Sequence, residues 1–407
     1  MSWAIRPSAN LAGLVCDKVG IARALRRIRP PECLRELHWV YADPAPTKHL
    51  FGVSALNAGS GVSDSLERAS WKAFGECIER YCAAAAYYTG GVSELSPAGN
   101  GLRLERFRLY ASSHRSLVPF DFVDSRKPIR TCMFLNEATG LEEAVPAQFA
   151  YVPYPFANGE AAFDDLDSTG LACSYDLETA KKRGLLEVLE RDAYMKWWRG
   201  ELDALRIDTQ VDDVTMPQAL LGAIARSGLE LRVLVLTPFQ TVRVFLSFLC
   251  SDEQGWPRIV LGLGCADTSA RALRLSLEEA LLGFVGYAER LRRVQDDSAL
   301  SHPEPDFAKP FHYAATAHGA ALLRARVEGK RDGTLSSLIR SDCPSDFAAI
   351  ANTVSRSGYE VLWREITTPD VALAGMKVAR VICPQAQRLD KRYPHAGATY
   401  EHPHPFP

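Results

Sequence analysis

A short acidic pattern that occurs twice constrains this chain more than any other feature of its sequence. The pattern is Glu-x-x-Glu-Arg with apolar residues between the acids, and it stands at residues 76–80 and again at residues 187–191. On a helix, two carboxylates three residues apart lie on one side and repel each other. A neighbouring cation or a bound metal ion must offset that repulsion. Two such pairs supply four carboxylates, which are the ligands that a hard cation such as Mg2+ prefers.

The composition is that of an ordinary globular protein. With 407 residues, 47% of them apolar and 24% charged, the chain can bury a large core. A formal net charge of -2 offers no electrostatic attraction to nucleic acid or to an anionic membrane. The sequence shows neither a signal-peptide pattern nor an apolar run long enough to cross a bilayer. We therefore expect a cytoplasmic enzyme, with no nucleic-acid and no membrane partner.

The cysteines and histidines show no spacing typical of a metal site. The ten cysteines include no Cys-x-x-Cys motif, and the nearest pair, Cys77 and Cys82, suits neither a zinc site nor a redox site. The nine histidines form no His-x-x-x-His motif. We interpret the cysteines as buried, reduced thiols rather than as a disulfide framework.

The first acidic pair lies on a predicted helix of about 20 residues. Asp64 followed by Glu67 has the spacing of a capping box at its start. Glu76 and Glu79 lie opposite the apolar stripe, so a solvent-exposed face is one interpretation of this pair. The stripe recurs at helical spacing: Phe74, Ile78, Tyr81 and Ala85.

The second acidic pair lies on another predicted helix, with Asp176 as its N-cap and Trp198 near its end. Here Glu187 and Glu190 flank the apolar stripe, so a solvated face explains them less well. A loop of small residues at 167–172 precedes the helix and allows the backbone to approach a ligand closely.

The rest of the chain mixes strands with helices, which predicts an α+β fold. Apolar runs at residues 231–236, 242–246 and 259–261, followed by a third helix from Ser269, are interpreted as βαβ-like. The last hundred residues add a predicted helix and two predicted strands, at residues 347–355, 359–363 and 378–382.

Two explanations of the acidic pairs remain open on these grounds. A single copy is commonplace on an exposed helix, where Glu and Arg pair with each other, whereas two copies make a metal site about as good an explanation. A di-iron bundle fits less well, because such sites use Glu-x-x-His. The sequence lacks the usual glycine-rich nucleotide motifs, so any phosphate binding depends on metal ions and carboxylates.

The acidic pairs and the segments around them resemble the YcaO family. The order and spacing of these segments carry the resemblance over nearly the whole chain: residues 57–61, 73–81, 168–172, 184–193 and 366–370, and the Pro-x-Pro-x-Pro ending at 403–407. The resemblance implies a YcaO-like α+β fold, with mixed sheets packed by long helices.

This resemblance also implies one YcaO-like unit over residues 1–407. Within it we expect an N-terminal segment 1–65, an ATP- and Mg-binding core 66–300 and a C-terminal portion 301–407.

An ATP-dependent cyclodehydratase subunit is the activity that the resemblance implies. A Cys, Ser or Thr side chain of a ribosomal precursor peptide attacks the preceding amide carbonyl, and an azoline forms when the amide oxygen leaves as phosphate. An amide oxygen leaves only once it is phosphorylated, and Mg2+ spreads the charge of the transferring phosphoryl group. The implied partners are the precursor peptide, a separate leader-peptide-binding protein, a flavin-dependent azoline dehydrogenase and a second copy of the chain in a homodimer.

Site residues follow from the resemblance position by position. Arg80 and Arg191 would bind phosphate or orient the acids, with ion pairs inside their helices as the alternative. The terminal carboxylate of Pro407 would assist proton transfer, delivered by a stiff spacer of alternating prolines. Ser168 and Lys72 are assigned to the nucleotide as well. The residues assigned to Mg2+, and through it to ATP, are Glu76, Glu79, Glu187 and Glu190.

At several motif positions the chain departs from the family's pattern. Lys72 stands where the family has serine before the first acidic pair. The second motif falls on Ala172 and Thr179, and the third, Gln-x-x-x-Arg, on Leu282 and Gly286. These differences favour the alternative of a degenerate scaffold that does not hydrolyse ATP. A YcaO-type thioamide-forming enzyme is another alternative, which the Pro-x-Pro-x-Pro ending disfavours.

Overall fold

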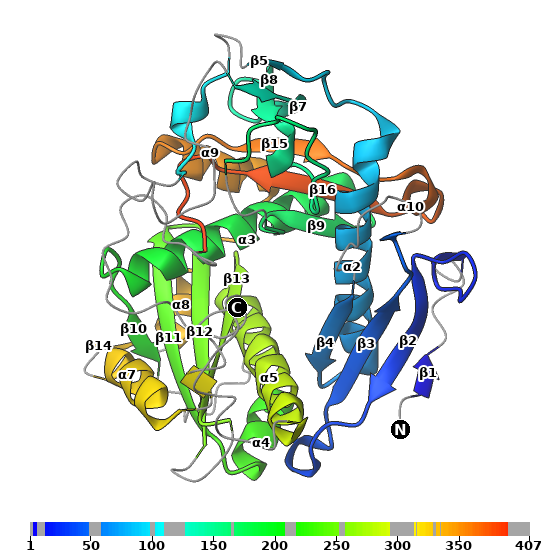
Figure 1. Ribbon diagram of the computed structural model, residues 1–407. Helices are drawn as coiled ribbons and strands as arrows, with labels where there is room; N and C mark the ends of the chain where they lie inside the picture. The colour runs from blue at the N-terminus through cyan, green and yellow to red at the C-terminus, as the bar shows by residue number, and fades with distance from the viewer. Residues whose placement is uncertain are drawn as a thin grey trace.

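Three long helices and the edge strands of three sheets surround the centre of the protein (Figure 1). The helices are α2 (Leu66–Ala85), α3 (Leu177–Trp198) and α5 (Ser269–Arg293). This computed structural model describes residues 3–5, 13–48, 58–97, 102–109, 127–163, 167–207, 217–251, 257–293, 313–314, 316–328, 331–333 and 335–389.

The strands form three larger sheets and one short pair, and most neighbouring strands are antiparallel. The first sheet has the order β1-β2-β3-β4, the second β13-β12-β11-β10-β14 and the third β8-β7-β15-β16-β9, while β5 pairs with β6. The bounds are β1 Trp3–Ile5, β2 Ala22–Ile28, β3 His38–Pro44, β4 Gly59–Ser63, β5 Ser96–Pro97, β6 Pro128–Ile129, β7 Thr131–Asn136, β8 Glu142–Pro146, β9 Leu171–Ser174, β10 Leu205–Ile207, β11 Glu230–Phe239, β12 Val242–Cys250, β13 Ile259–Ala266, β14 Arg331–Gly333, β15 Leu362–Glu365 and β16 Lys377–Ile382.

Shorter helices complete the described part of the chain: α4 Gln218–Arg226, α7 Ala317–Val327, α8 Leu335–Arg340, α9 Phe347–Arg356 and α10 Pro369–Leu373. Together these elements confirm the predicted α+β class, with mixed sheets packed by long helices. No described helix is both long enough and apolar enough to cross a bilayer.

Helices and edge strands alternate in a closed ring. Helix α2 packs against β4 and β9, α3 against β9 and β13, and α5 against β13 and β4. Each of these strands is the edge strand of its own sheet, so its outward N–H groups find no partner strand. The ring therefore directs unpaired backbone donors from three sheets toward one central space.

Glycines allow the helices to lie directly on the edge strands. A Cβ atom at Gly262 of β13 would lie 2.1 Å from the backbone nitrogen of Ala280 on α5. A Cβ atom at Gly59 of β4 would lie 1.9 Å from the backbone oxygen of Ala73 on α2. Both distances are far below van der Waals contact, so only glycine fits at these two positions.

The helix starts confirm one sequence prediction and correct another. Asp176 is the N-cap of α3 as predicted, and its carboxylate accepts the N–H of Thr179 at 2.7 Å. The N-cap of α2 is Ser65, because its hydroxyl accepts the N–H of Arg68, so the predicted capping box at Asp64 was wrong by one residue. Asp64 instead pairs with Arg68 and Arg274.

The predicted βαβ unit was also wrong. Strands β11, β12 and β13 are antiparallel neighbours, and β11 is joined to β12 by only two residues. So short a connection makes a hairpin, whereas a parallel crossover needs a dozen or more residues. Helix α5 follows these strands instead of connecting them.

The cysteines are free thiols, as the sequence predicts, but not all of them are buried. Cys33 and Cys343 are exposed and Cys16 is half-buried, whereas the other seven are buried. The interpretation of the cysteines as small apolar residues therefore holds for those seven.

Candidate active site: a cavity lined by six glutamates

A cavity of about 550 Å³ lies at the centre of the ring. It is lined by residues of α2, α3 and α5, and by residues of β4, β9 and β13. Six glutamates of α2, α3 and α5 line it, and we call it the acidic cavity after them. Glu278 pairs with a basic residue, and the other five accept backbone N–H groups: Glu76, Glu79, Glu187, Glu190 and Glu279.

Three of these glutamates accept an N–H group from the strand that precedes their own helix or, for Glu187, from the residue just before that strand. The carboxylate of Glu76 accepts the N–H of Ser60 at 2.9 Å, that of Glu187 the N–H of Gly170 at 2.8 Å, and that of Glu279 the N–H of Leu263 at 2.8 Å. The acceptor follows the donor by 16, 17 and 16 residues. Three strand–helix units thus repeat one local arrangement.

The other two glutamates reach the next strand of the ring. Glu79 of α2 accepts the N–H of Cys173 on β9 at 2.7 Å, and Glu190 of α3 accepts the N–H of Cys265 on β13. On α5 the residue three positions after Glu279 is Leu282, which lines the cavity as an apolar side chain. In each Glu-x-x-Glu pair, the first glutamate therefore binds at the strand that precedes its own helix. The second glutamate binds the strand that precedes the next helix of the ring.

Negative charge in the acidic cavity is not balanced by these hydrogen bonds. Burial, and then repulsion from Glu187, raises the pKa of Glu79 well above its usual value. Burial and repulsion from Glu279 and Glu187 do the same to Glu190. Burial raises the pKa of Glu279 to about 7. The three side chains are half-buried, since they lie deep in the protein yet open onto the cavity.

The position of Glu79 argues against the interpretation of the first acidic pair as a solvated helix face. Glu79 accepts a bond from β9 and lines a central cavity, and its carboxyl is among those that burial affects most. The helix has two packed sides, because α2 contacts β4 and β9 as well as the core beneath its apolar stripe. The side of α2 opposite its apolar stripe is therefore not exposed to solvent at Glu79.

A basic group lines the other side of the acidic cavity. Lys72 donates to Glu278 at 2.7 Å, and the carboxylate of Glu278 also accepts the hydroxyl of Ser63 at 2.7 Å. These contacts join α2, α5 and β4, and Glu278 is only 2% exposed. The other basic residues that line the cavity are Arg68, Arg183, Arg271 and Arg274.

The two arginines of the acidic patterns lie behind the acids. Arg80 pairs with Glu76 at 2.5 Å and donates to the carbonyl of Ala58 at 2.6 Å. Arg191 pairs with Glu187 at 2.7 Å and donates to the hydroxyl of Thr169 at 2.6 Å. In this geometry each arginine orients an acid from within its own helix and does not line the acidic cavity.

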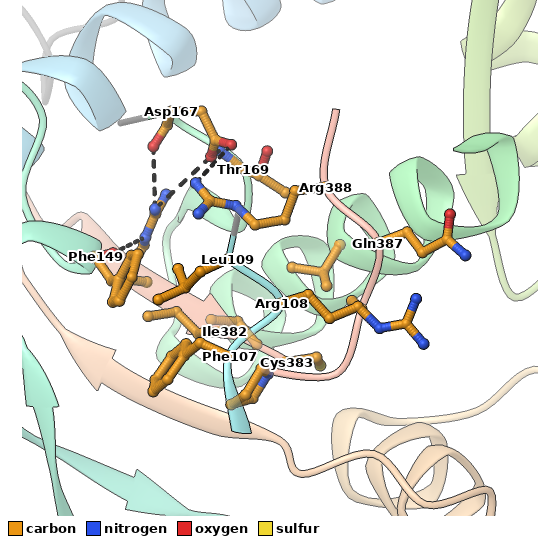
Figure 2. A pocket seen from close by; sticks show the side chains of 15 residues that line it. Phe107, Arg108, Leu109, Phe149, Asp167, Thr169, Ile382, Cys383, Gln387 and Arg388 are labelled. Carbon is orange, nitrogen blue, oxygen red and sulfur yellow. Dashed lines mark hydrogen bonds and ion pairs between the residues drawn. The ribbon is translucent and has the colours of Figure 1, made fainter. Parts of the chain in front are cut away.

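A smaller cavity lies behind the loop that carries Thr169 (Figure 2). In this cavity Asp167 pairs with Arg388 at 3.0 Å, and its backbone carbonyl accepts Arg380 at 3.0 Å. Burial lowers the pKa of Arg380 to about 10, although Asp167 acts in the opposite direction. These contacts hold the loop that contains Asp167 and Thr169 in place. Gly170, the residue after Thr169, donates its N–H to Glu187. The smaller cavity thus supports the acidic cavity from behind.

The structure brings together some assigned residues and not others. Lys72 and the four glutamates assigned to Mg2+ line the acidic cavity, whereas Ser168 lies in the loop behind it, half-buried, with its carbonyl bonded to the N–H of Leu171. Pro407 lies outside the described residues. Gly286 does not line the cavity, while Leu282 does.

Glu278 and Glu279 are the glutamates of the cavity that sequence analysis missed. They belong to no Glu-x-x-Glu-Arg pattern, so their helix was interpreted only through its apolar side chains. One signal was present: Gly262-Leu263-Gly264 stands ahead of Glu279 much as Gly59-Ser60-Gly61 stands ahead of Glu76.

The donor set fits Mg2+ and a phosphate-bearing ligand. Hard carboxylate oxygens with raised pKa values face the cavity from three helices, and the basic side can receive phosphate oxygens. Within the described residues, no three carboxylate, imidazole or thiol groups already converge as ligands of one ion.

Comparison with known proteins gives this arrangement a family context. The chain matches the model of the YcaO cyclodehydratase family, described as ATP- and Mg2+-binding, over residues 60–387. No curated protein matches the sequence.

Three solved structures are similar to the chain in fold. A heterocyclase in complex with substrate and cofactor has a TM-score of 0.72 and 17% identity, covering 96% of this chain and 54% of that one. The YcaO protein of Methanopyrus kandleri bound with AMPPCP and Mg2+ has a TM-score of 0.64 and 16% identity, covering 88% and 84%. The E. coli microcin synthetase McbBCD complex has a TM-score of 0.64 and 14% identity, covering 94% and 96%. The chain thus spans about half the length of the heterocyclase.

Proposed function

This chain belongs to the YcaO family, and from that premise we propose that it is the ATP-dependent cyclodehydratase subunit of a peptide-modifying system. Its substrate would be a ribosomal precursor peptide, whose Cys, Ser or Thr residues become azolines. The observation that carries the proposal is the acidic cavity, in which glutamates of α2, α3 and α5 face a basic side contributed by α2, α3 and α5. Carboxylates next to guanidinium and ammonium groups are what a magnesium-bound triphosphate requires.

In this proposal Mg2+ and ATP supply the phosphoryl group that turns the amide oxygen of the substrate into a leaving group. Glu79, Glu187 and Glu190 would hold the cation, with Glu76 beside them. The edge-strand N–H groups orient one oxygen of each carboxylate, so the acids are held in place before any ligand enters.

The basic side would orient the phosphates. Arg183 and Arg271 line the cavity, and Arg274 lines it while also forming an ion pair with Asp64. Arg80 and Arg191 are then positioning residues, because their guanidinium groups bind Glu76 and Glu187 and not the cavity. Ser168 would act only through the loop that holds Glu187.

Partners of the chain are part of the proposal. A precursor peptide and a separate leader-peptide-binding protein would act with it, and a flavin-dependent dehydrogenase and a homodimeric state remain expectations. The similarity to a multi-protein complex, the microcin synthetase, supports the general idea of partner proteins. We expect the enzyme in the cytoplasm, where precursor peptides and ATP are available.

The test is to combine the full chain with its leader-binding protein, a candidate precursor and Mg2+-ATP, and to measure the mass of the peptide. Loss of one water per ring supports the proposal, whereas exchange of oxygen for sulfur would point to thioamide formation. The variant Glu187→Gln with Glu190→Gln should abolish product and ATP use. The exposed Glu67 on the first turn of α2 offers a control, and Glu67→Gln should behave as wild type.

A scaffold that no longer hydrolyses ATP is a second candidate, which a specific observation favours. Lys72 is already paired with Glu278 inside the cavity, and Leu282 adds an apolar side chain there. On this hypothesis the chain assembles with its partners but shows no nucleotide binding by calorimetry, and the double glutamine variant assembles equally well. An unchanged peptide mass together with absent nucleotide binding would therefore decide for the scaffold.

A further inference from the structure

Two aromatic side chains stack on each other beside the acidic cavity, where α2 packs against β9. The rings of Trp71 and Tyr175 are nearly parallel, with an interplanar angle of 11° and centroids 5.0 Å apart. Trp71 belongs to α2 and lines the acidic cavity, and Tyr175 directly follows β9. We call this pair the aromatic wall, because it joins α2 to the segment before α3 at the edge of the cavity.

The aromatic wall is held in place, yet it is open to solvent. Tyr175 is 56% exposed, although its ring rests on that of Trp71, which is itself half-buried. The next residue, Asp176, caps α3 and so fixes the backbone that carries the tyrosine. A ring that is already fixed loses little conformational entropy when a ligand covers it, which makes such tyrosines and tryptophans good binding contacts. The aromatic wall is therefore suited to an apolar group of a ligand.

A second apolar surface of the acidic cavity lies on α5 and β13. Leu275 and Leu282 line the cavity from one face of α5, and Leu263 of β13 lines it too. These three leucines are buried or half-buried, whereas Tyr175 is exposed. A nucleotide carries one base and so accounts for one apolar surface. The enclosed surface suits the base, and the open aromatic wall suits a chain that extends from the cavity into solvent, as a peptide does.

The distance from the acids determines which part of a peptide the aromatic wall can meet. Glu79 accepts the N–H of Cys173, and Tyr175 lies two residues farther along the chain, about 7 Å at the rise of a strand. Trp71 precedes Glu79 by eight residues on α2, about 12 Å at the rise of a helix. An extended peptide spans about 3.4 Å per residue, so these lengths correspond to roughly two to four of its residues.

We propose that the aromatic wall is a substrate subsite, which takes an apolar side chain of the precursor peptide roughly two to four residues from the residue that reacts. This inference deepens the proposed function and rests on it, because it takes the reacting amide of the peptide to enter the acidic cavity. Trp71 and Tyr175 then determine specificity, by favouring precursors with an aromatic or large aliphatic residue at that distance. They take no part in the phosphoryl transfer.

Binding of two synthetic peptides to the full chain tests this subsite. Both are capped nonapeptides with a central Cys among glycines, and one of them has Phe three residues before and three residues after the Cys. With Mg2+ and AMPPCP present, isothermal titration calorimetry should show that the wild type binds the Phe peptide about tenfold more tightly than the glycine peptide. Tyr175→Ala should reduce this preference to about twofold or less, and Tyr175→Phe should retain it, because the ring and not the hydroxyl makes the contact.

Two further variants separate loss of the subsite from loss of structure. Tyr175→Gln keeps a side chain over Trp71 without a ring, so it should lose the preference as Tyr175→Ala does. Tyr88 offers a matched control, since it is 49% exposed, its ring contacts that of Tyr87 with centroids 5.0 Å apart, and it does not line the acidic cavity. Tyr88→Ala should therefore bind both peptides as the wild type does.

The same calorimetry shows whether a nucleobase occupies the aromatic wall instead. A roughly tenfold loss of AMPPCP affinity in Tyr175→Ala, with the peptide preference intact, would assign the aromatic wall to the base and overturn the proposal. Equal affinity of the wild type for the two peptides, or binding of neither, would overturn it as well. So would a preference that survives in both Tyr175→Ala and Tyr175→Gln.

These outcomes do not depend on turnover. A chain that forms no azoline can still prefer the Phe peptide and lose that preference in Tyr175→Ala, so the subsite would stand while the proposed activity fails. Azoline formation by a wild type without the preference would support the activity and overturn the subsite. Absence of both azoline formation and peptide binding would contradict both.

Discussion

At the scale of single residues, the glutamates of the acidic cavity combine a structural bond with an unbalanced charge. Glu79, Glu190 and Glu279 each accept an N–H of an edge strand, and each has a pKa above the ordinary value of a glutamate, burial being the main cause. The folded protein therefore binds their protons more tightly than the unfolded chain does. A cation and a proton compete for the same carboxylates.

The sign of the resulting pH dependence follows from these raised pKa values. The stabilisation from the bound protons is complete below the ordinary pKa of 4.5 and is lost as the pH rises through the folded value, which for Glu279 is about 7. Saturating Mg2+ should restore it at high pH. We expect Mg2+ to raise the melting temperature by about 3 °C at about pH 8 and by less than half of that at about pH 5.5.

Differential scanning calorimetry of the full chain measures this difference. The variant Glu190→Gln with Glu279→Gln lacks two of the repelling charges, so it should melt higher than the wild type without Mg2+ at about pH 8 and respond less to the ion. Equal Mg2+ shifts at both pH values would show that these carboxylates do not control the response.

At the scale of elements, close contact between a helix and an edge strand positions the acids. Gly262 faces α5 so closely that Gly262→Ala would force Cβ within 2.1 Å of backbone. Overpacking against backbone that cannot move should lower the free energy of unfolding by about 3 kcal/mol or more. We expect this variant to lose Mg2+ binding as well, because Leu263 and Cys265 would no longer meet Glu279 and Glu190.

A matched control lies on the same helix. A Cβ atom at Gly283 of α5 would have its nearest contact, Val260, at 4.0 Å, which is ordinary packing distance. Since alanine is the better helix former, Gly283→Ala should raise the free energy of unfolding by up to about 1 kcal/mol. Urea unfolding followed by circular dichroism compares the two. Similar free energies of unfolding for the two variants would mean that α5 does not pack as closely on β13 as the structure shows.

How well the sequence predicts an element depends on how local its determinants are. The three long helices follow from apolar periodicity, and Asp176 caps one of them as predicted, because these signals act within a few residues. Strand pairing is not local, so β11 and β12 were predicted as strands but not as a hairpin. Glu279 was missed for the same reason, since its significance depends on its contact with Leu263 and its proximity to Glu190.

At the scale of the whole molecule, the site exists only because three distant segments close a ring. Residues of β4, β9 and β13 come from three different sheets, and the third sheet joins strands that are far apart in the chain, with β16 beside β9 and β15 between β16 and β7. The four glutamates of the repeated pattern are visible in the sequence, but the cavity that gives them a common ligand is a property of the closed ring. This long-range closure could be inferred only by resemblance.

Closure of the ring predicts that its three strands respond to a ligand together. Glutamates that clamp the N–H groups of Ser60, Cys173 and Leu263 share the same cavity, so a ligand that stabilises one helix–strand contact stabilises the ring. In hydrogen-exchange mass spectrometry, Mg2+ with AMPPCP should slow exchange in peptides of β4, β9 and β13 by a similar factor, about tenfold or more, at one ligand concentration. The distant strand β2 should change little. Protection confined to one edge strand would mean that the three strand–helix units respond to the ligand independently. The ring would then not close cooperatively around the ligand.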